Sequence, residues 1–344
     1  MPQRDSTRRV TLDDVAQRAG VHKATVSRAL DPATAGQISD ETVRRVQEAA
    51  RELGYVPNIV ARGLRKNASM TIGVVIPDLT NPFFPPIVRG IEDHLQSRGY
   101  TALIANTDGD DAIEEAQFTS LLGRRVDGLI VATGRHGDQP VLARAHAAGV
   151  RAVMLNRDAG SLPYPLVTGD DADGITAAVE HLHGLGHRDV VHIAGPLDLS
   201  TSIVRADAFR AAVDARKGMR GRVVEASALT VAAGRDSMEH ILAEQPIPTA
   251  VVASNDLIAL GVLRALRAHG RSCPGEVSVV GFNDMLFAED MQPPLTTVRV
   301  PAAEMGAEAA RMLLAQLHGE EQDHARVVLP VSLVVRESTG PAPR

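Results

Sequence analysis

The chain has 344 residues, a formal net charge of −6, and a composition that is 44% hydrophobic and 23% charged. These values exclude a disordered chain and allow two or three domains with a substantial core. The single cysteine, Cys273, excludes an intrachain disulfide and is typical of a reducing compartment. No apolar run suits a signal peptide or approaches the roughly 20 residues of a membrane span. We therefore expect a cytoplasmic protein without a membrane partner.

The charges are unevenly distributed along the chain. Residues 1–67 hold 12 Lys and Arg against 8 Asp and Glu, whereas the remainder holds 24 against 34. A basic N-terminal part joined to an acidic body is typical of a nucleic-acid contact confined to one end. The basic excess is modest, so it supports this interpretation without establishing it.

Residues 11–30 predict two short helices joined by the tight turn Ala19-Gly20-Val21. Thr11 and Asp14 have the spacing of a capping box at the start of the first helix. Each helix carries an apolar stripe, and packing the stripes together leaves the polar face of the second helix exposed. A helix-turn-helix needs this arrangement to dock in the major groove of DNA, although an ordinary hairpin of two helices has the same spacing.

The next segments predict one more helix and then a weak one. Residues 31–37 form a turn-rich loop, and a third helix runs from Asp40 to Leu53, with Ser39 as its cap and Gly54 at its end. Residues 58–66 have a weak helical pattern and are too short to be helical alone. Residues 67–69 are expected to be a linker.

From Met70 onward, short β-branched runs alternate with amphipathic segments of about a dozen residues. This alternation predicts an α/β fold with parallel sheets covered by helices on both faces. Because about 270 residues exceed what one such sheet usually needs, two lobes are expected. The predicted strands are Ile72–Ile76, Ala102–Ala105, Gly128–Val131, Ala152–Leu155, Val190–Ala194, Val223–Ala226, Ala250–Ala253 and Val277–Phe282.

A series of local strings extends from Val10 to about Ser338, and their order and spacing are highly specific. They are Thr11-Leu-Asp-Asp-Val-Ala16, Ala24-Thr-Val-Ser-Arg-Ala-Leu30, Gly54-Tyr-Val-Pro-Asn58, Ala61-Arg-Gly-Leu64, Ile72-Gly-Val-Val-Ile-Pro77, Asn81-Pro-Phe-Phe84, Arg125-Val-Asp-Gly-Leu-Ile130, Leu185-Gly-His-Arg188, Asn255-Asp256, Ser278-Val-Val-Gly-Phe-Asn-Asp284, Pro294-Leu-Thr-Thr-Val298 and Leu329-Pro-Val-Ser-Leu333. Together they resemble the LacI/GalR family of transcriptional repressors.

This resemblance implies a domain organisation. A helix-turn-helix headpiece would occupy residues 10–57, a hinge helix and linker 58–69, and an effector-binding and dimerisation core 70–338. The core would be two-lobed and similar to type I periplasmic sugar-binding proteins, with three crossovers between the lobes. Lobe one would take about 71–165 plus 296–322, and lobe two about 166–293 plus 323–338.

The resemblance also implies which residues contact operator DNA. Lys23 and Ala24 would occupy the positions that vary with operator sequence, and Arg28 would be a third base-reading position. Thr11, Thr25 and Ser27 are expected to bind phosphate. The alternative for Lys23 is a solvated charge. His22 replaces the Ser or Thr that is usual at the helix cap, which predicts a weaker cap or a phosphate contact.

In the hinge, the resemblance implies minor-groove contacts by Asn58, Ala61 and Leu64. Leu64 would be an apolar wedge that kinks the duplex, although packing within a linker turn is the alternative. Unstacking a base step costs a few kcal/mol, so two hinges are expected side by side. This predicts a homodimer on a pseudo-palindromic double-stranded operator. The chain's last residues carry no heptad repeat, so no coiled coil is expected to join dimers into tetramers.

A small-molecule effector would bind between the lobes, at the carboxyl ends of the strands. Leu229, Asn283 and Ala208 depart from residues common in the family, which weakens an assignment to a galactoside or a purine. A sugar, a sugar derivative or a nucleoside is expected, and two arginines near the cleft also allow a sugar acid or a phosphate. Core packing of the phenylalanines and an interlobe salt bridge of Arg205 are the alternatives. The expected effector-binding residues are Phe83, Phe84, Asn156, Arg157, Arg205, Asn255 and Asn283.

These expectations describe a regulator, most simply a repressor, whose operator affinity changes when the effector binds. The direction of the change stays open. The histidines at 181, 183, 187 and 192 lack a standard zinc spacing, so no metal and no cofactor are expected. No catalytic motif stands between a strand and a helix, so an enzyme is not expected. A transport-type binding protein and a sugar-processing enzyme are the alternative functions.

Overall fold

The structure is a computed structural model that describes residues 10–56, 68–137, 139–244, 246–320 and 326–343. The chain forms two compact units, residues 1–69 and 70–344. The predicted hinge, residues 58–66, lies outside the described residues.

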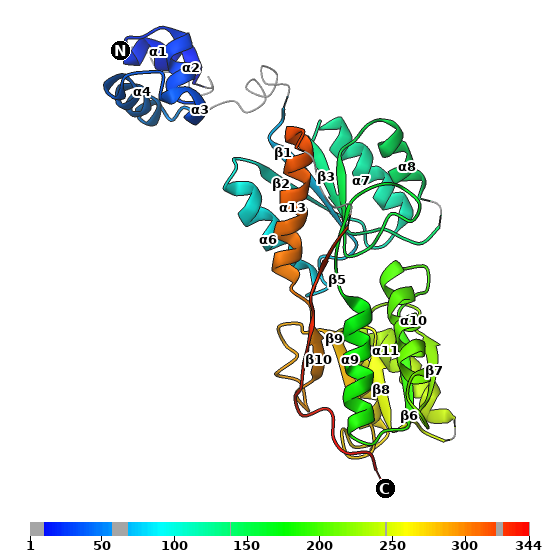
Figure 1. Cartoon of the computed structure of the whole chain (residues 1–344). Coiled ribbons are helices and arrows are strands. Elements are labelled where there is room, and N and C mark those ends of the chain that lie inside the picture. Colours follow the sequence, from blue (N-terminus) through cyan, green and yellow to red (C-terminus); the bar gives the residue numbers. More distant parts are fainter. Residues whose placement is uncertain (1–9, 57–67, 138, 245, 321–325, 344) are drawn as a thin grey trace. The chain divides into compact units, whose positions relative to one another are not determined.

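The N-terminal unit is a cluster of short helices around a small apolar core (Figure 1). Val15, Val26 and Val46, one from each of three helices, are fully buried there. The predicted loop at 31–37 is wrong in one respect, because the Asp31 carbonyl accepts hydrogen bonds from two following N–H groups and starts a helical turn. The helices are α1 (Leu12–Ala19), α2 (Lys23–Ala29), α3 (Pro32–Ala35) and α4 (Asp40–Leu53).

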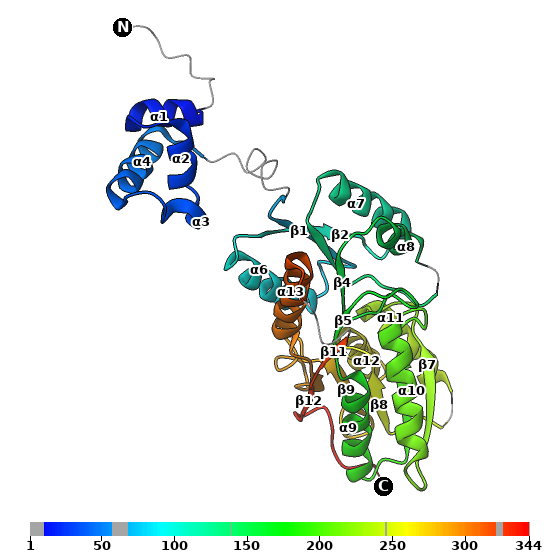
Figure 2. The same ribbon diagram turned by 45° about the horizontal axis from the view of Figure 1, so that its top comes forward.

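The first sheet of the larger unit is wholly parallel, in the order β11-β5-β4-β3-β1-β2. Alternate residues of its strands face opposite layers: Val74 packs with α6 and α13, and Val75 packs with α7 and α8. Figure 2 shows these two pairs of helices on opposite sides of the sheet. The strands are β1 (Thr71–Ile76), β2 (Thr101–Asn106), β3 (Gly128–Val131), β4 (Ala152–Leu155), β5 (Leu166–Gly169) and β11 (Arg326–Leu329); the helices are α6 (Phe84–Gln96), α7 (Asp111–Gly123), α8 (Pro140–Ala147) and α13 (Ala302–His318).

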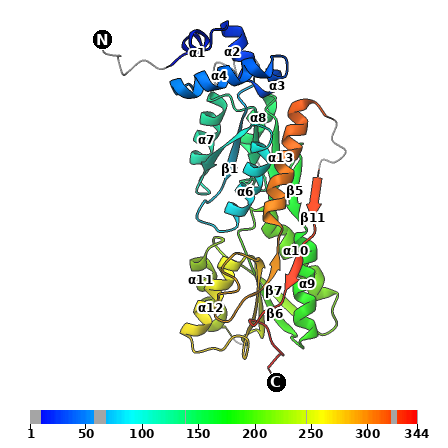
Figure 3. The same ribbon diagram turned by 90° about the vertical axis from the view of Figure 1, so that its left-hand side faces the viewer.

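The second sheet has the order β12-β10-β9-β8-β6-β7 and is parallel except for β12. Helices α9 and α10 cover one face, and α11 and α12 cover the other (Figure 3). The strands are β6 (Asp189–Ala194), β7 (Arg220–Glu225), β8 (Ala250–Ala253), β9 (Ser278–Asn283), β10 (Thr296–Arg299) and β12 (Ser332–Val334); the helices are α9 (Asp171–Gly184), α10 (Ser200–Asp214), α11 (Val231–Ala243) and α12 (Asp256–Ala268).

The strand pairing corrects the expected lobe boundaries, because the chain crosses between the lobes one strand later than predicted each time. β5 pairs with β4, so lobe one extends to Gly169 and does not end at 165. β10 pairs with β9 and therefore belongs to lobe two, whereas the prediction placed residues from 296 in lobe one. β11 pairs with β5, so residues 326–329 belong to lobe one and not to lobe two. Main-chain hydrogen bonding fixes each assignment.

None of the helices among the described residues has the length and apolar character needed to cross a membrane.

Helices α6 and α13 pack with their backbones in close approach. A Cβ atom built on Gly90 of α6 would lie 1.9 Å from the carbonyl oxygen of Ala303, and one built on Gly306 of α13 would lie 2.0 Å from the carbonyl oxygen of Ile87. Neither carbonyl can move without shifting a helix. Glycine is therefore required at both positions, although each lies in the interior of a helix.

Replacing Gly90 with alanine should destabilise the core domain, because the new methyl group must push α13 away from α6. We expect Gly90→Ala to lower the free energy of unfolding by about 1–3 kcal/mol in chemical denaturation. Gly123→Ala is the matched control, since Gly123 ends α7 with no atom within 4 Å of a built Cβ. The control should be neutral or stabilising by up to about 1 kcal/mol. Equal stability of the two variants would contradict the close contact.

Candidate DNA-binding face and effector cleft

The start of α1 confirms the predicted capping box. The hydroxyl oxygen of Thr11 accepts a hydrogen bond from the backbone N–H of Asp14 at 3.4 Å. In return, the Asp14 carboxylate accepts hydrogen bonds from the Thr11 backbone N–H at 2.8 Å and hydroxyl at 2.7 Å. Gly20 then ends α1 with a φ of 63°, which turns the chain toward α2. The two helices are therefore held at a fixed tight turn.

Helix α2 buries one face and exposes the other. Val26 and Ala29 are buried, whereas Lys23, Ala24 and Arg28 are exposed. Of the residues expected to contact phosphate, Thr11 is exposed, and Thr25 and Ser27 are partly buried. The residues expected to read bases thus share the open face of one short helix, as insertion into a major groove requires.

Two polar contacts shape the N-terminal end of α2. The Nδ1 atom of His22 accepts a hydrogen bond from the Ala24 backbone N–H at 3.2 Å, so His22 caps the helix. The Nζ atom of Lys23 lies 2.7 Å from a carboxylate oxygen of Asp13, and both side chains are more than half exposed. Such an exposed ion pair contributes little stability, so Lys23 can exchange Asp13 for another partner at small cost.

The expected hinge contacts, Asn58, Ala61 and Leu64, lie outside the described residues.

In the core domain, loops that follow strands of the two lobes meet at their carboxyl ends. The Asp158 backbone N–H, just after β4, donates a hydrogen bond to the Ser200 hydroxyl oxygen at 3.2 Å. The His136 backbone N–H donates to the Asp198 carbonyl at 2.6 Å, and Arg135 forms an ion pair with the Asp198 carboxylate. These contacts bring the two lobes together beside the expected effector position.

A cavity of about 200 Å³ opens between the lobes. Its lining comes from β5, β11 and the residues that follow β4, and from the N-terminal parts of α9 and α10. Asn156, one of the expected effector residues, lies in this lining with a φ of 65°. The lining residues are Asn156, Asp158, Leu166, Thr168, Gly169, Asp170, Asp171, Ala172, Ser200, Thr201, Val204, Arg326 and Val328.

Phe83 and Phe84 belong to the hydrophobic core. They expose 5% and 2% of their surface, and their rings pack edge to face with centroids 5.5 Å apart. This geometry corresponds to core packing, the alternative considered for these residues.

Arg205 makes a buried ion pair within lobe two. Its Nε and Nη2 atoms donate to one carboxylate oxygen of Asp171 at 3.1 and 2.8 Å, and Nη1 donates to the Ser254 carbonyl at 2.6 Å. The guanidinium also lies 3.8 Å from the ring centroid of Phe282. Burial raises the pKa of Asp171, and the nearby Arg205 opposes that rise. Arg205 thus forms a salt bridge between α10 and α9, both in the same lobe, and not the interlobe bridge considered from the sequence.

The two expected asparagines differ in what they can offer a ligand. Asn255 caps α12: its Oδ1 accepts from the Ile258 N–H at 2.8 Å, and its Nδ2 donates to the Leu229 carbonyl at 3.2 Å. Asn283, at the end of β9, has a φ of 111° and a buried Oδ1 without a hydrogen-bond partner. Asn283 is therefore the better placed of the two to accept a bond from a ligand.

Further buried polar atoms at the strand ends were missed by sequence reasoning. The hydroxyl oxygens of Ser202, in the first turn of α10, and Ser254, just after β8, lack hydrogen-bond partners. The Nε atom of Arg157, which was among the expected effector-binding residues, also lacks a hydrogen-bond partner. The only sequence signal for the serines was their place beside Arg205 and Asn255. These atoms and the Oδ1 of Asn283 include both hydrogen-bond donors and acceptors.

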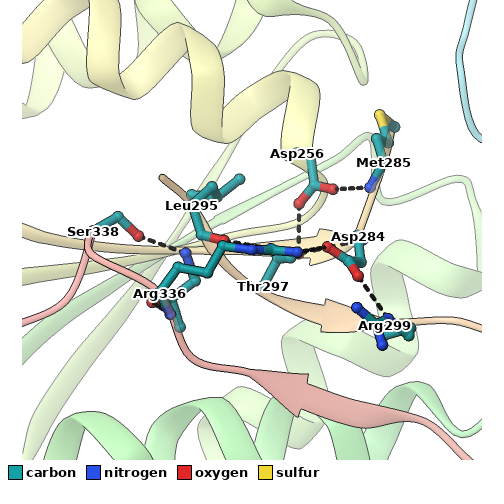
Figure 4. Close-up of polar contacts among 9 residues, drawn as sticks. Asp256, Asp284, Met285, Leu295, Thr297, Arg299, Arg336 and Ser338 are labelled. Carbon is teal, nitrogen blue, oxygen red and sulfur yellow. Dashed lines mark hydrogen bonds and ion pairs between the residues drawn. The ribbon is translucent and has the colours of Figure 1, made fainter. Parts of the chain in front are cut away.

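The turn after β9 is anchored by two arginines, Arg299 at the end of β10 and Arg336 just after β12 (Figure 4). The Asp284 carboxylate accepts from Arg299 Nε at 2.6 Å and from Arg336 Nη2 at 2.7 Å. Asp284 itself has a φ of 54°, so its backbone and that of Asn283 are both left-handed. The two ion pairs fix Asp284, and they thereby help to hold the neighbouring Asn283 in its left-handed backbone conformation.

Behind this turn lies a buried carboxyl group, that of Asp256. One of its oxygens accepts from the Thr297 hydroxyl at 2.6 Å, and the other accepts from the Met285 backbone N–H at 2.7 Å (Figure 4). Burial raises its pKa to about 7, although these hydrogen bonds act in the opposite direction. Within the part of the chain that the structure describes, no ion pair reaches Asp256, and Arg299 and Arg336 pair with Asp284.

The raised pKa of Asp256 should make stability depend on pH. An aspartate in the unfolded chain has a pKa near 4, so between about pH 4 and 7 the folded state binds a proton more tightly. The free energy of unfolding should therefore fall as pH rises through this range, by at most about 1.4 kcal/mol per pH unit from this group. Chemical denaturation at several pH values measures this dependence. The fall in the free energy of unfolding with pH should be absent in Asp256→Asn and should remain in Asp93→Asn, a control at an exposed residue. An unchanged slope in Asp256→Asn would contradict the assignment.

Two family models match the chain. The model described as "Bacterial regulatory proteins, lacI family" matches residues 11–58, and the "Periplasmic binding protein-like domain" matches residues 179–339. Both lie where the resemblance of the sequence placed a headpiece and a sugar-binding-protein-like core.

Relatives match over almost the whole chain. The transcriptional regulator DegA of Bacillus subtilis is 34% identical over 336 residues, covering 97% of this chain and 99% of the relative. The repressor CytR of Escherichia coli is 32% identical, covering 97% of each chain.

Solved structures agree with the sequence relatives. The Lac repressor dimer bound to operator and an anti-inducer superimposes with a TM-score of 0.85 and 30% identity, covering 97% of this chain and all of that chain. The complex of the regulator CelR with cellobiose gives a TM-score of 0.73 at 34% identity, covering 96% of this chain and all of that one. These matches confirm the expected fold and family. The chain belongs to the LacI family of bacterial transcriptional regulators, with a helix-turn-helix headpiece and a periplasmic-binding-protein-like core.

Proposed function

We propose that this regulator represses transcription by binding an operator through the exposed face of α2. An effector that binds between the lobes would then lower or raise the affinity for the operator. The observation that carries the proposal is the division of α2 into a buried apolar face and an open face with Lys23, Ala24 and Arg28. Its relatives are regulators, and we propose that this chain likewise performs no catalysis and works in the cytoplasm.

The chemistry of the open face supports distinct roles in reading bases. Arg28 can donate two parallel hydrogen bonds to guanine, and Lys23 can donate to guanine O6 or N7. Ala24 offers only a methyl group, which suits the methyl group of thymine. Thr11, Thr25 and Ser27 would bind phosphates and fix the register of the helix on the duplex.

A single headpiece is small, so we propose that a homodimer binds a pseudo-palindromic operator. Asn58, Ala61 and Leu64 of the two hinges would then meet in the minor groove, with Leu64 as the wedge. The Lac repressor, a structural neighbour, is described as a dimer on operator DNA.

We propose a polyhydroxylated effector, a sugar, a sugar derivative or a nucleoside. Buried polar atoms without partners on Ser202, Ser254 and Asn283 support this class, because hydroxyl groups can both donate to and accept from them. Among solved relatives, CelR binds cellobiose, and a LacI-family regulator from Enterococcus faecium holds ribose.

Arg28→Ala should weaken operator binding. Loss of a bidentate contact to guanine costs about 1–3 kcal/mol, which is roughly a 5- to 150-fold rise in Kd. Gel shifts with upstream intergenic DNA, at one fixed salt concentration, measure the change. Arg220→Ala is the control, since Arg220 is an exposed arginine of β7 and its removal changes net charge equally. Equal Kd values for Arg28→Ala and wild type on a mapped operator would refute the assignment.

The effector part of the proposal is tested by repeating the gel shift with a panel of sugars and nucleosides. We expect at least one ligand to change the operator Kd by about 5- to 150-fold, the usual range of allosteric coupling. Mass spectrometry should recover that ligand chemically unchanged. Turnover of the ligand by the pure protein would favour an enzyme instead.

A further inference from the structure

The open face of α2 is joined by an acidic side chain from the neighbouring helix. Asp13, in the first turn of α1, places a carboxylate oxygen 2.7 Å from the Nζ atom of Lys23, the first residue of α2. The two side chains expose 66% and 54% of their surface, so both charged groups lie in solvent. An acid beside a base-reading lysine needs an explanation, because the phosphates that border the major groove repel it.

The fold of the headpiece does not provide that explanation. Thr11 and Asp14 form the capping box that starts α1, and Asp14 also supplies a negative charge to the first turn. Among the described residues, the carboxylate of Asp13 forms its ion pair with Lys23. Because such an exposed pair contributes little stability, a role in DNA binding is the better reason for its position.

The predicted headpiece carries no excess of positive charge. Residues 10–57 hold six Lys and Arg against seven Asp and Glu, so the basic excess of residues 1–67 lies in the flanking segments. Within the headpiece, Arg18 is also paired, with Glu52. Attraction to DNA of any sequence grows with the number of phosphates that a protein's cations neutralise. A balanced headpiece therefore favours selective binding over indiscriminate binding.

The pairing with Asp13 restrains a side chain that could otherwise bind many partners. Lysine carries a point charge on a flexible stem, with three donors that can rotate. In the observed position one donor is used by Asp13, which leaves two for the O6 and N7 acceptors of a guanine. If Lys23 turned to a phosphate, the carboxylate of Asp13 would stay unpaired beside the DNA backbone and would be repelled by it.

We infer that Asp13 determines how specifically α2 reads its operator. It holds the ammonium group of Lys23 where a base edge can accept a hydrogen bond, and it cancels the charge with which Lys23 would bind phosphates of any sequence. Such a residue gains specificity by weakening the binding of wrong partners. The inference rests on the proposed function and adds to α2 a positioning residue that acts through Lys23.

The first test compares operator DNA with a scrambled duplex. Asp13→Asn removes the charge and keeps the size of the side chain. Full-length protein is titrated with the operator footprinted in the upstream intergenic DNA, and with a scrambled duplex of equal length, at several salt concentrations. Asp13→Asn should bind the scrambled duplex about 3- to 10-fold more tightly, and the slope of log K against log salt should steepen by about 0.9 for each headpiece bound.

Glu48→Gln is the matched control for this test. Glu48 is an exposed residue of α4, and its replacement changes the net charge equally. This control should keep the affinity and the salt dependence of wild type. An Asp13→Asn variant that binds the scrambled duplex no more tightly than Glu48→Gln does would overturn the inference.

The second test asks whether Asp13 acts through Lys23. On operators with single base-pair changes, Lys23→Met should flatten the preference at one base pair of each half-site. Asp13→Asn should weaken the preference at that same pair by about threefold or more, and the double variant should lose nothing beyond Lys23→Met. Asp13→Glu keeps the charge and should bind the scrambled duplex as weakly as wild type does.

Three results of the second test would overturn the inference. The preference at the pair read by Lys23 could be unchanged in Asp13→Asn, or Lys23→Met could flatten no preference at all. A loss at a different base pair would show that Asp13 reads DNA directly.

Wild-type binding separates this inference from the proposed function. If wild type prefers upstream DNA to scrambled DNA while the tests of Asp13 fail, only the role of Asp13 is wrong. If wild type shows no such preference, the proposed function fails and the inference fails with it. Asp13→Asn should melt at the temperature of wild type, because the pair is exposed. A clearly lower melting temperature would show that Asp13 supports the fold and would count against its role in specificity.

Discussion

At each crossover between the lobes, the last strand before the crossing pairs with the sheet that the chain is about to leave. This pairing determines where the polar groups of the core can lie close together. β5 joins the first sheet before the chain enters the second, and β10 joins the second before the chain returns; β11 and β12 are then added at the edges of the two sheets. The parallel pairing in both sheets therefore continues up to the point where the chain crosses between the lobes. The loops after those strands meet there, as the hydrogen bond between Asp158 and Ser200 shows. The cleft follows directly from this order of strands.

Two buried arginines, Arg205 and Arg157, have different roles in this core. Arg205 joins α9 to α10 through Asp171, so it contributes to the architecture of lobe two. Arg157 forms no ion pair among the described residues, and its buried Nε atom lacks a hydrogen-bond partner. Asn283 is held in place indirectly, because two arginines form ion pairs with the neighbouring Asp284. Rigid support behind an unsatisfied group is what a preorganised binding site requires.

Local patterns predicted the headpiece closely, because helix caps and apolar stripes are short-range features. The helix from Asp40 to Leu53 and the capping box of Thr11 are examples. The lobe boundaries were wrong because four-residue strands such as β5 have no periodicity that reveals their partner. The pairing of Arg205 with Asp171 could not be predicted either, since 34 residues separate them and Asp171 looks like an ordinary helix-start acid. Which arginine stays unpaired depends on such distant contacts.

The glycines at the crossing of α6 and α13 have a mechanical consequence. Where side chains separate two helices, rotamer changes absorb small displacements before they reach the partner. At Gly90 and Gly306 no side chain separates the helices, so the backbone of one helix contacts the backbone of the other directly. A shift of α13, which follows directly on a crossover, is therefore passed to α6 without slack. The two helices should therefore move together as one rigid unit. A displacement of the crossover that precedes α13 would then displace both helices on this face of lobe one.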